Sequence, residues 1–208
     1  MTLTTDTTFC TCEDPALKSC PACAAYEQEE RDKRKAERIA RSGLPRKLRT
    51  AALLTYPASL TDAATRWAEG EIAGLCLTGP VGVGKTCLAA WATEKRLQNH
   101  SVKWVSVSRL MTQLRSGFGS EMKANADKIV AGTGAIVLDD LDKVNPTDYG
   151  KEVILAAVEG RYQAGSPLLV TTNKELSELK DKLDAPVASR LAEYCEVIRM
   201  SGEDRRLS

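Results

Sequence analysis

The segment that most constrains this 208-residue chain is Gly79-Pro80-Val81-Gly82-Val83-Gly84-Lys85-Thr86, which fits the pattern G-x-x-x-x-G-K-T. An apolar, strand-like run at 72–78 precedes it, and helix-forming residues follow from Lys85. Glycines in such a loop let backbone N–H groups converge on phosphate oxygens, and the helix N-terminus adds the positive end of its dipole. The segment therefore predicts a nucleoside triphosphate site, with Lys85 on the β- and γ-phosphates and the Thr86 hydroxyl on Mg²⁺. The predicted nucleotide contacts are Gly79, Pro80, Val81, Gly82, Val83, Gly84, Lys85, Thr86, Cys87 and Asp139.

Two more strand-like runs end in polar side chains. The run at 135–138 is followed by Asp139 and Asp140. We expect Asp139 to hold Mg²⁺ through water and Asp140 to orient or deprotonate the attacking water. Asp142 is interpreted as a loop residue. Asn173 follows the run at 167–171 and is predicted to hydrogen-bond the γ-phosphate or the attacking water, with Thr171 and Thr172 able to share that role. The alternative is that Asn173 caps the next helix.

The alternation of strand and helix patterns predicts the α/β class, with a parallel sheet flanked by helices. The strands of such a sheet are apolar and rich in β-branched residues because helices cover both of its faces. The predicted strands are 72–78, 102–107, 135–138, 167–171 and 196–200, and the predicted helices are 60–69, 85–98, 108–116, 121–130, 149–163 and 186–194.

The N-terminal segment at 1–25 is polar and cysteine-rich, and Pro15 and Pro21 argue against regular structure in it. Its thiols have a spacing that predicts a zinc knuckle that binds Zn²⁺, with an iron–sulfur cluster or free thiols as alternatives. The four predicted ligands are Cys10, Cys12, Cys20 and Cys23. A charged helical linker is expected at 26–45, ended by Gly43 and Pro45, and one nucleotide-binding domain at 46–208. The other cysteines, Cys76, Cys87 and Cys195, are interpreted as small buried residues.

The net charge of +1 gives no global attraction to nucleic acid, so any such contact must be a local patch. No apolar run is long enough to cross a bilayer, and the N-terminus lacks the features of a secretory signal. We therefore expect a cytoplasmic protein that has no membrane partner.

The order of these motifs resembles that of the DnaC/IstB-like AAA+ ATPases, over about residues 36–206. The parts that carry the resemblance are GPVGVGKTCLAA, AIVLDDLD, a helix ending in Glu159-Gly160-Arg161-Tyr162, PLLVTTN, ASRL and the segment at 202–206. The resemblance implies ATP as the nucleotide, Asn173 as first sensor and Arg190 as an arginine finger acting on a neighbouring subunit. Without the resemblance, the sequence favours a snorkelling surface residue at Arg190. The resemblance places Arg205 and Arg206 near a second position that senses the nucleotide. Alternatively, they are charged residues of the C-terminal tail.

The chain departs from that family's pattern in two places. The family often has glycine where this chain has Asp142 or Lys143, so the turn after the metal-binding strand is expected to differ. No C-terminal lid domain is expected, because the sequence ends at Ser208.

The resemblance implies an ATPase that self-associates and loads a ring-shaped hexameric replicative helicase onto single-stranded DNA. The alternatives are an IstB-type helper of DNA transposition, a small-molecule P-loop kinase, and a nucleotide-gated binding module that hardly hydrolyses ATP. The cysteine-rich segment is expected to dock onto the helicase. Arg109, Arg115, Lys123 and Phe118 are candidate DNA contacts, although Leu110, Met111 and Leu114 form an apolar stripe typical of an ordinary packed helix.

Overall fold

The computed structural model describes residues 21–49, 56–116, 134–144, 148–183 and 185–205. The chain divides into two compact units, residues 1–37 and 38–208. Helix α1 (Pro21–Ser42) supplies the described part of the first unit. It begins earlier than the sequence indicates, and the expectation that Pro21 opposes helix formation is wrong. Proline is favourable in the first turn of a helix, where its missing N–H would have no partner.

Within the first unit, ion pairs between residues one helical turn apart lie along α1. Arg31 pairs with Glu27, and Arg34 pairs with Glu30. At the end of the helix, in the second unit, the Ser42 hydroxyl donates to the Ile39 carbonyl and accepts the Leu44 N–H. Gly43, with φ of 78°, then turns the chain out of the helix.

The second unit contains a five-stranded sheet in which every described strand pair is parallel. The strand order is β2-β3-β4-β1-β5. This confirms the predicted fold class, and the observed strand ends shift from the predicted ones by only one or two residues. The strands are β1 (Gly74–Thr78), β2 (Val102–Ser106), β3 (Ala135–Asp139), β4 (Leu168–Thr172) and β5 (Cys195–Arg199).

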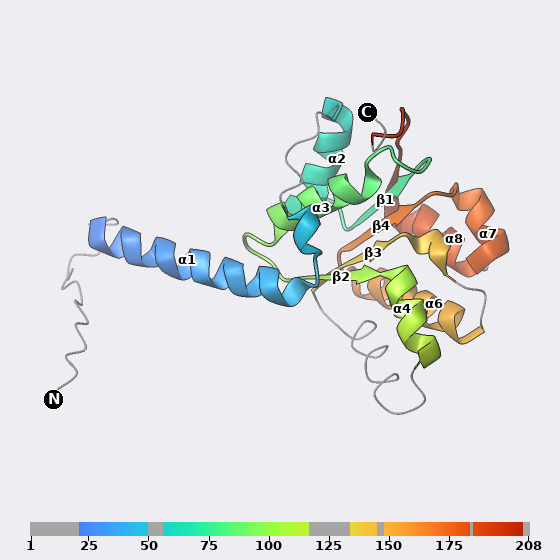
Figure 1. The fold of residues 1–208 in the computed structure, drawn as a ribbon, viewed down its shortest axis with the longest axis horizontal. Helices are drawn as coiled ribbons and strands as arrows, with labels where there is room; N and C mark the ends of the chain where they lie inside the picture. Colours follow the sequence, from blue (N-terminus) through green and yellow to red (C-terminus); the bar gives the residue numbers. More distant parts are fainter. Residues whose placement is uncertain (1–20, 50–55, 117–133, 145–147, 184, 206–208) are drawn as a thin grey trace. The chain divides into compact units, whose positions relative to one another are not determined.

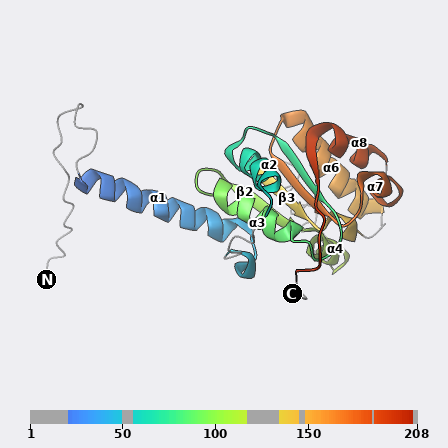
Figure 2. The same ribbon diagram turned by 90° about the horizontal axis from the view of Figure 1, so that it is seen from above.

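Helices cover both faces of the sheet (Figures 1 and 2). On one face, α2 (Ala58–Glu69) and α3 (Lys85–Arg96) pack against Leu75, Leu77 and Val137. On the other face, α4 (Val107–Ser116), α6 (Asp148–Ala164), α7 (Leu176–Leu183) and α8 (Ala185–Tyr194) pack against Cys76 and Ile136 and their neighbours. Successive strand residues point to opposite faces, so each apolar strand contributes to both layers of the core.

Five of the predicted helices correspond to α2, α3, α4, α6 and α8, and the predicted helix 121–130 lies outside the described residues. The sequence analysis missed α7, which has eight residues. Its start carries a local signal, since the Glu178 carboxylate accepts the backbone N–H of Glu175. Two 3₁₀ turns, η1 (Arg46–Leu48) and η2 (Leu141–Lys143), complete the described elements. Over the described part of the chain, no helix combines the length and the apolar character that spanning a membrane requires.

Candidate functional site

The sheet order brings three loops of the sequence to one edge. β4 lies between β3 and β1, so Gly79, Asp139 and Asn173 lie at or just beyond the carboxyl ends of three adjacent strands. Ligands of parallel α/β sheets bind at this edge. A cavity of about 300 Å³ lies here, lined by Val81, Gly82, Gly84, Lys85, Thr86, Cys87, Asp140, Lys143, Asn173 and Arg205. Most of the predicted nucleotide contacts therefore line one cavity, together with Lys143 and Arg205.

The loop after β1 has a conformation that requires glycine, as Gly82 and Gly84 show. Gly82 has φ of 87° and Gly84 has φ of 99°. A Cβ atom on Gly82 would lie 2.0 Å from the carboxyl carbon of Asp204, and one on Gly84 would lie 2.8 Å from the Tyr56 hydroxyl. Gly84 is also the N-cap of α3, so the loop passes directly into a helix N-terminus. Such a glycine-lined turn suits the close approach of a phosphate group.

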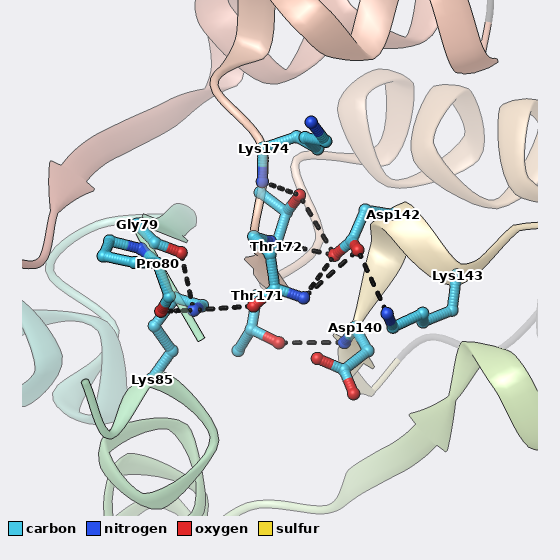
Figure 3. Close-up of polar contacts among 10 residues, drawn as sticks. Gly79, Pro80, Lys85, Asp140, Asp142, Lys143, Thr171, Thr172 and Lys174 are labelled. Carbon is cyan, nitrogen blue, oxygen red and sulfur yellow. Dashed lines mark hydrogen bonds and ion pairs between the residues drawn. The ribbon is translucent and has the colours of Figure 1, made fainter. Parts of the chain in front are cut away.

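Lys85 places a buried ammonium group inside this loop. The residue is 4% exposed, and its Nζ donates to the Gly79 and Pro80 carbonyls, both at 2.7 Å, and to the Asn173 side-chain oxygen at 2.9 Å. Figure 3 shows Lys85 directed between the start of the loop and the end of β4. Phosphate oxygens are acceptors of the same kind as these carbonyl oxygens, so the ammonium is suited to bind them.

Asp139 and Thr86 meet as the magnesium prediction requires. One oxygen of Asp139 accepts the Thr86 hydroxyl at 3.0 Å and the Thr171 hydroxyl at 2.8 Å. Burial raises the pKa of Asp139 to about 6, and the neighbouring Asp140 adds to the rise against the opposing effects of Thr171, Thr86 and Lys85. A buried carboxylate beside a hydroxyl is a donor set that a divalent cation stabilises. The residues therefore fit a site for Mg²⁺, which Asp139 and Thr86 would hold.

Asp140 turns its backbone into the left-handed region, with φ of 58°. Among the described non-glycine residues it is the only one with positive φ. Its N–H donates to the Thr171 hydroxyl at 2.9 Å, and its side chain lines the cavity. Aspartate tolerates this conformation better than most residues, and such backbone geometry is often found at functional sites. This turn places a carboxylate in the wall of the cavity, where it can orient a water molecule or accept a proton from it.

The interpretation of Asp142 as an ordinary loop residue is wrong. Asp142 lies in η2 and is 5% exposed. Its carboxylate accepts the Asn173 backbone N–H at 2.8 Å and the Asn173 side-chain amide at 3.0 and 3.1 Å. Burial acts to raise the pKa of Asp142, but the hydrogen bonds from Asn173 and the charge of Lys143 outweigh it and hold the pKa below its ordinary value. These contacts also show that the Asn173 side chain does not serve as a helix cap.

Arg190 does not line the described cavity of its own chain. It lies on α8, where its Nε donates to Glu159 at 2.8 Å and its guanidinium donates to Glu193 at 3.0 Å. The guanidinium also lies 4.5 Å from the centre of the Tyr162 ring. To contact a nucleotide held by another subunit, Arg190 would have to exchange these two carboxylates for phosphate.

Arg205 and Tyr56 support the glycine loop from the other side. The Arg205 backbone N–H donates to the Gly82 carbonyl at 3.1 Å, and its guanidinium lies 4.7 Å from the centre of the Tyr56 ring. The Tyr56 hydroxyl donates to the Gly84 carbonyl at 2.9 Å. The sequence analysis missed Tyr56 because it lies outside every motif. Arg206 lies outside the described residues.

The structure settles part of the remaining predictions. Leu110 and Met111 are buried in the core and Leu114 packs against it, so the apolar stripe of α4 is confirmed, while Arg109 is exposed. Cys76 and Cys195 are buried, as predicted, whereas Cys87 is only partly buried. The other predicted contacts lie outside the described residues or have side chains that are not described: Arg115, Phe118, Lys123, Cys10, Cys12, Cys20 and Cys23.

The comparison with known protein families agrees with a nucleotide-binding site in this cavity. Residues 24–208 match the family described as IstB-like ATP binding protein. No curated protein matches the sequence. The fold is similar to the crystal structure of DnaI, with 23% identity, a TM-score of 0.66, and coverage of 79% of this chain and 95% of that chain.

Two further structures show the same likeness. The DnaC helicase loader has 22% identity, a TM-score of 0.62, and coverage of 76% of this chain and 100% of that chain. The replication initiator DnaA bound to AMPPCP and single-stranded DNA has 15% identity, a TM-score of 0.63, and coverage of 77% of this chain and 52% of that chain. At these identities the likeness shows the fold alone, which is the AAA+ P-loop fold. Because the family match spans nearly all of the sequence, the chain belongs to the family of IstB-like ATP-binding proteins.

Proposed function

We propose that this protein is a Mg²⁺-dependent ATPase that loads a hexameric replicative helicase onto single-stranded DNA. The observation that carries the ATPase part is the convergence of Lys85, Thr86 and Asp139 at the carboxyl edge of the sheet. The Thr86 hydroxyl lies 3.0 Å from the Asp139 carboxylate, and the Lys85 ammonium lies inside the loop after β1. Positioning and charge neutralisation of this kind supply most of the catalysis in phosphoryl transfer.

The residues divide the work of hydrolysis between them. Lys85 and the loop amides bind the phosphates, and Thr86 with Asp139 holds the cation. When bound, Mg²⁺ would neutralise charge on the phosphate oxygens. Asp140 orients the attacking water and accepts its proton, and Asn173 contributes a hydrogen bond beside it. Arg190 supplies positive charge to a site on a neighbouring subunit, which requires self-association through the ATPase surface.

The loader role is supported by the likeness to the DnaC helicase loader, together with the cysteine-rich segment. We propose that Cys10, Cys12, Cys20 and Cys23 bind Zn²⁺ and that the resulting knuckle docks onto the helicase in the cytoplasm. Replacing Cys20 and Cys23 with serine should abolish helicase capture and leave ATP binding intact. Unchanged capture would exclude the docking role, and metal analysis of the purified protein tests the zinc directly.

The experiment that tests the loader role is co-purification of the full chain with a replicative helicase, with ATP and Mg²⁺, with ADP, and without nucleotide. A defined complex that depends on ATP, and that Lys85→Ala fails to form, supports the proposal. Addition of labelled single-stranded DNA to the complex then tests transfer of the helicase. No association under any of these conditions would exclude a helicase loader.

A second candidate is the transposition helper, which the match to the IstB-like family favours. This candidate predicts ATP-dependent assembly on duplex DNA and retention of a transposase rather than a helicase. Binding to duplex and single-stranded DNA of equal length, measured with ATP, separates the two. Turnover measured in the same samples also tests the third possibility, a nucleotide-gated module, which would bind ATP yet show no stimulated hydrolysis.

A further inference from the structure

The Asn173 side-chain amide lies between two groups of opposite hydrogen-bonding character. Its oxygen accepts from the Lys85 ammonium at 2.9 Å. Its nitrogen donates to both oxygens of the Asp142 carboxylate, at 3.0 and 3.1 Å. An ammonium can only donate and an ionised carboxylate can only accept, so only one orientation of the amide satisfies both neighbours. The reversed amide would place NH₂ against the ammonium and oxygen against the carboxylate.

Asp142 is held firmly enough to impose this orientation. It is 5% exposed, and one of its oxygens also accepts the Asn173 backbone N–H at 2.8 Å. The Thr172 hydroxyl lies 3.5 Å from the same oxygen, and the Lys143 ammonium lies 3.8 Å from the other. Figure 3 shows this carboxylate between Lys143 and the end of β4. Several charge-assisted contacts therefore fix the carboxylate that the Asn173 amide meets.

We propose that Asp142 is a positioning residue that sets the polarity of the Asn173 amide, so that Asn173 presents its oxygen to Lys85 and to the nucleotide site. An oxygen cannot donate a hydrogen bond to a phosphate oxygen. Asn173 therefore acts on the Lys85 ammonium, or accepts a hydrogen bond from the attacking water, and does not donate to the γ-phosphate. This narrows the two roles that the sequence leaves open for Asn173, and its kinetic consequence rests on the proposed ATPase function.

Asp142→Asn is the substitution that isolates this effect. The new side chain has the same shape, and its remaining oxygen can still accept the Asn173 backbone N–H. Its NH₂ group, however, faces the Asn173 amide nitrogen, and two donors cannot bond to each other. The Asn173 NH₂ group then keeps one acceptor in place of two, and the new NH₂ group repels it. The Asn173 amide is therefore expected to lose its fixed orientation. Asp62→Asn is the matched control, since Asp62 is an exposed carboxylate on α2 whose partner is Arg66.

The first measurement is the side-chain ¹⁵N–¹H spectrum of the nucleotide-free protein. In the parent, the Asn173 NH₂ protons bond to a buried carboxylate, so their signals should be shifted downfield and should exchange slowly with solvent. Asp142→Asn should move these signals and speed their exchange, and Asp62→Asn should leave them in place. Superimposable Asn173 signals in the parent and Asp142→Asn would refute the proposal, whether or not the protein hydrolyses ATP.

The second measurement is a double-mutant cycle in ATP turnover. Asp142→Asn and Asn173→Ala should each lower kcat by about tenfold, with KM for ATP changed by less than about threefold, because the contacts of residues 79–86 remain. If Asp142 acts through Asn173, the double variant should lie within about twofold of Asn173→Ala. A double variant slowed by the product of the two effects, about a hundredfold, would mean that Asp142 acts independently. A parent that neither binds nor hydrolyses ATP would refute the proposed function, and the spectrum would still decide the orientation of Asn173.

Discussion

Asp139→Asn should make the metal-free protein more stable while removing its ability to hold Mg²⁺. Both hydroxyls that donate to Asp139, those of Thr86 and Thr171, bond to the same carboxylate oxygen. An asparagine oxygen in that place can accept both. The substitution therefore removes a buried charge and keeps these two hydrogen bonds.

The magnitude follows from the pKa of Asp139, which burial raises from 3.8 to about 6. A pKa difference of this size means that ionised Asp139 destabilises the folded state by about 3 kcal/mol at neutral pH, relative to the protonated group. Because the folded-state pKa is the higher one, the parent gains stability from this group below pH 3.8 and loses that stability as the pH rises through about 6. The advantage of Asp139→Asn should therefore be largest above about pH 6 and disappear in acid.

Urea unfolding monitored by tryptophan fluorescence, in a metal chelator and from pH 4 to 8, measures this difference. Trp67 and Trp104 are buried, so the signal reports loss of the core. At pH 7 the variant should be more stable by about 1–3 kcal/mol, a rise in Tm of roughly 2–12 °C for a domain of this size. Adding Mg²⁺ and ATP should reverse the order, because both proteins keep the loop that binds the phosphates but only the parent keeps the carboxylate that holds the cation. Equal stabilities at pH 7, or a difference that persists unchanged in acid, would refute the reasoning.

Other substitutions test the rest of the site. Lys85→Ala should weaken ATP binding at least tenfold in a titration with a fluorescent analogue, and an unchanged affinity would exclude the loop as the phosphate site. Gly84→Ala should destabilise the fold by about 1–3 kcal/mol in urea unfolding, because φ is 99° and the Tyr56 hydroxyl would lie 2.8 Å from the new Cβ, whereas Gly165→Ala, which meets no atom within 4 Å, should cost less. Mixing inactive Arg190→Ala with inactive Lys85→Ala should restore part of the turnover, since an arginine finger acts across subunits, and a mixture that stays inactive would place Arg190 outside catalysis.

Much of the fold follows from local patterns in the sequence. Strands buried on both faces must be apolar throughout, so their runs are easy to find, and the glycine loop fixes where the first strand ends. The sequence analysis missed helix α7 because it is only eight residues long, LSELKDKL, and four of its side chains are charged, as in a surface loop. Pro21 led to the opposite error, in which a helical residue was predicted to be irregular. Proline disrupts the interior of a helix but is well suited to its first turn.

The candidate site was predictable where a motif joins neighbouring residues and not where the fold joins distant ones. Lys85, Thr86, Asp139 and Asn173 each follow a recognisable strand, and parallel pairing brings them together. Asp142 and Tyr56 gave no such signal, because their partners lie 31 and 28 positions away along the chain.

The hydrogen bonds from Tyr56 and Arg205 to the glycine loop after β1 limit how far the domain can be shortened. One bond reaches the Gly84 carbonyl from a residue ahead of α2, and the other reaches the Gly82 carbonyl from a residue beyond β5. The loop is thus braced by segments from opposite ends of the domain, stacked on each other through the tyrosine ring. A trimmed version that keeps the motifs between residues 79 and 190 but starts at Pro57 or stops at Met200 would retain the chemical groups and lose the contacts that shape the loop.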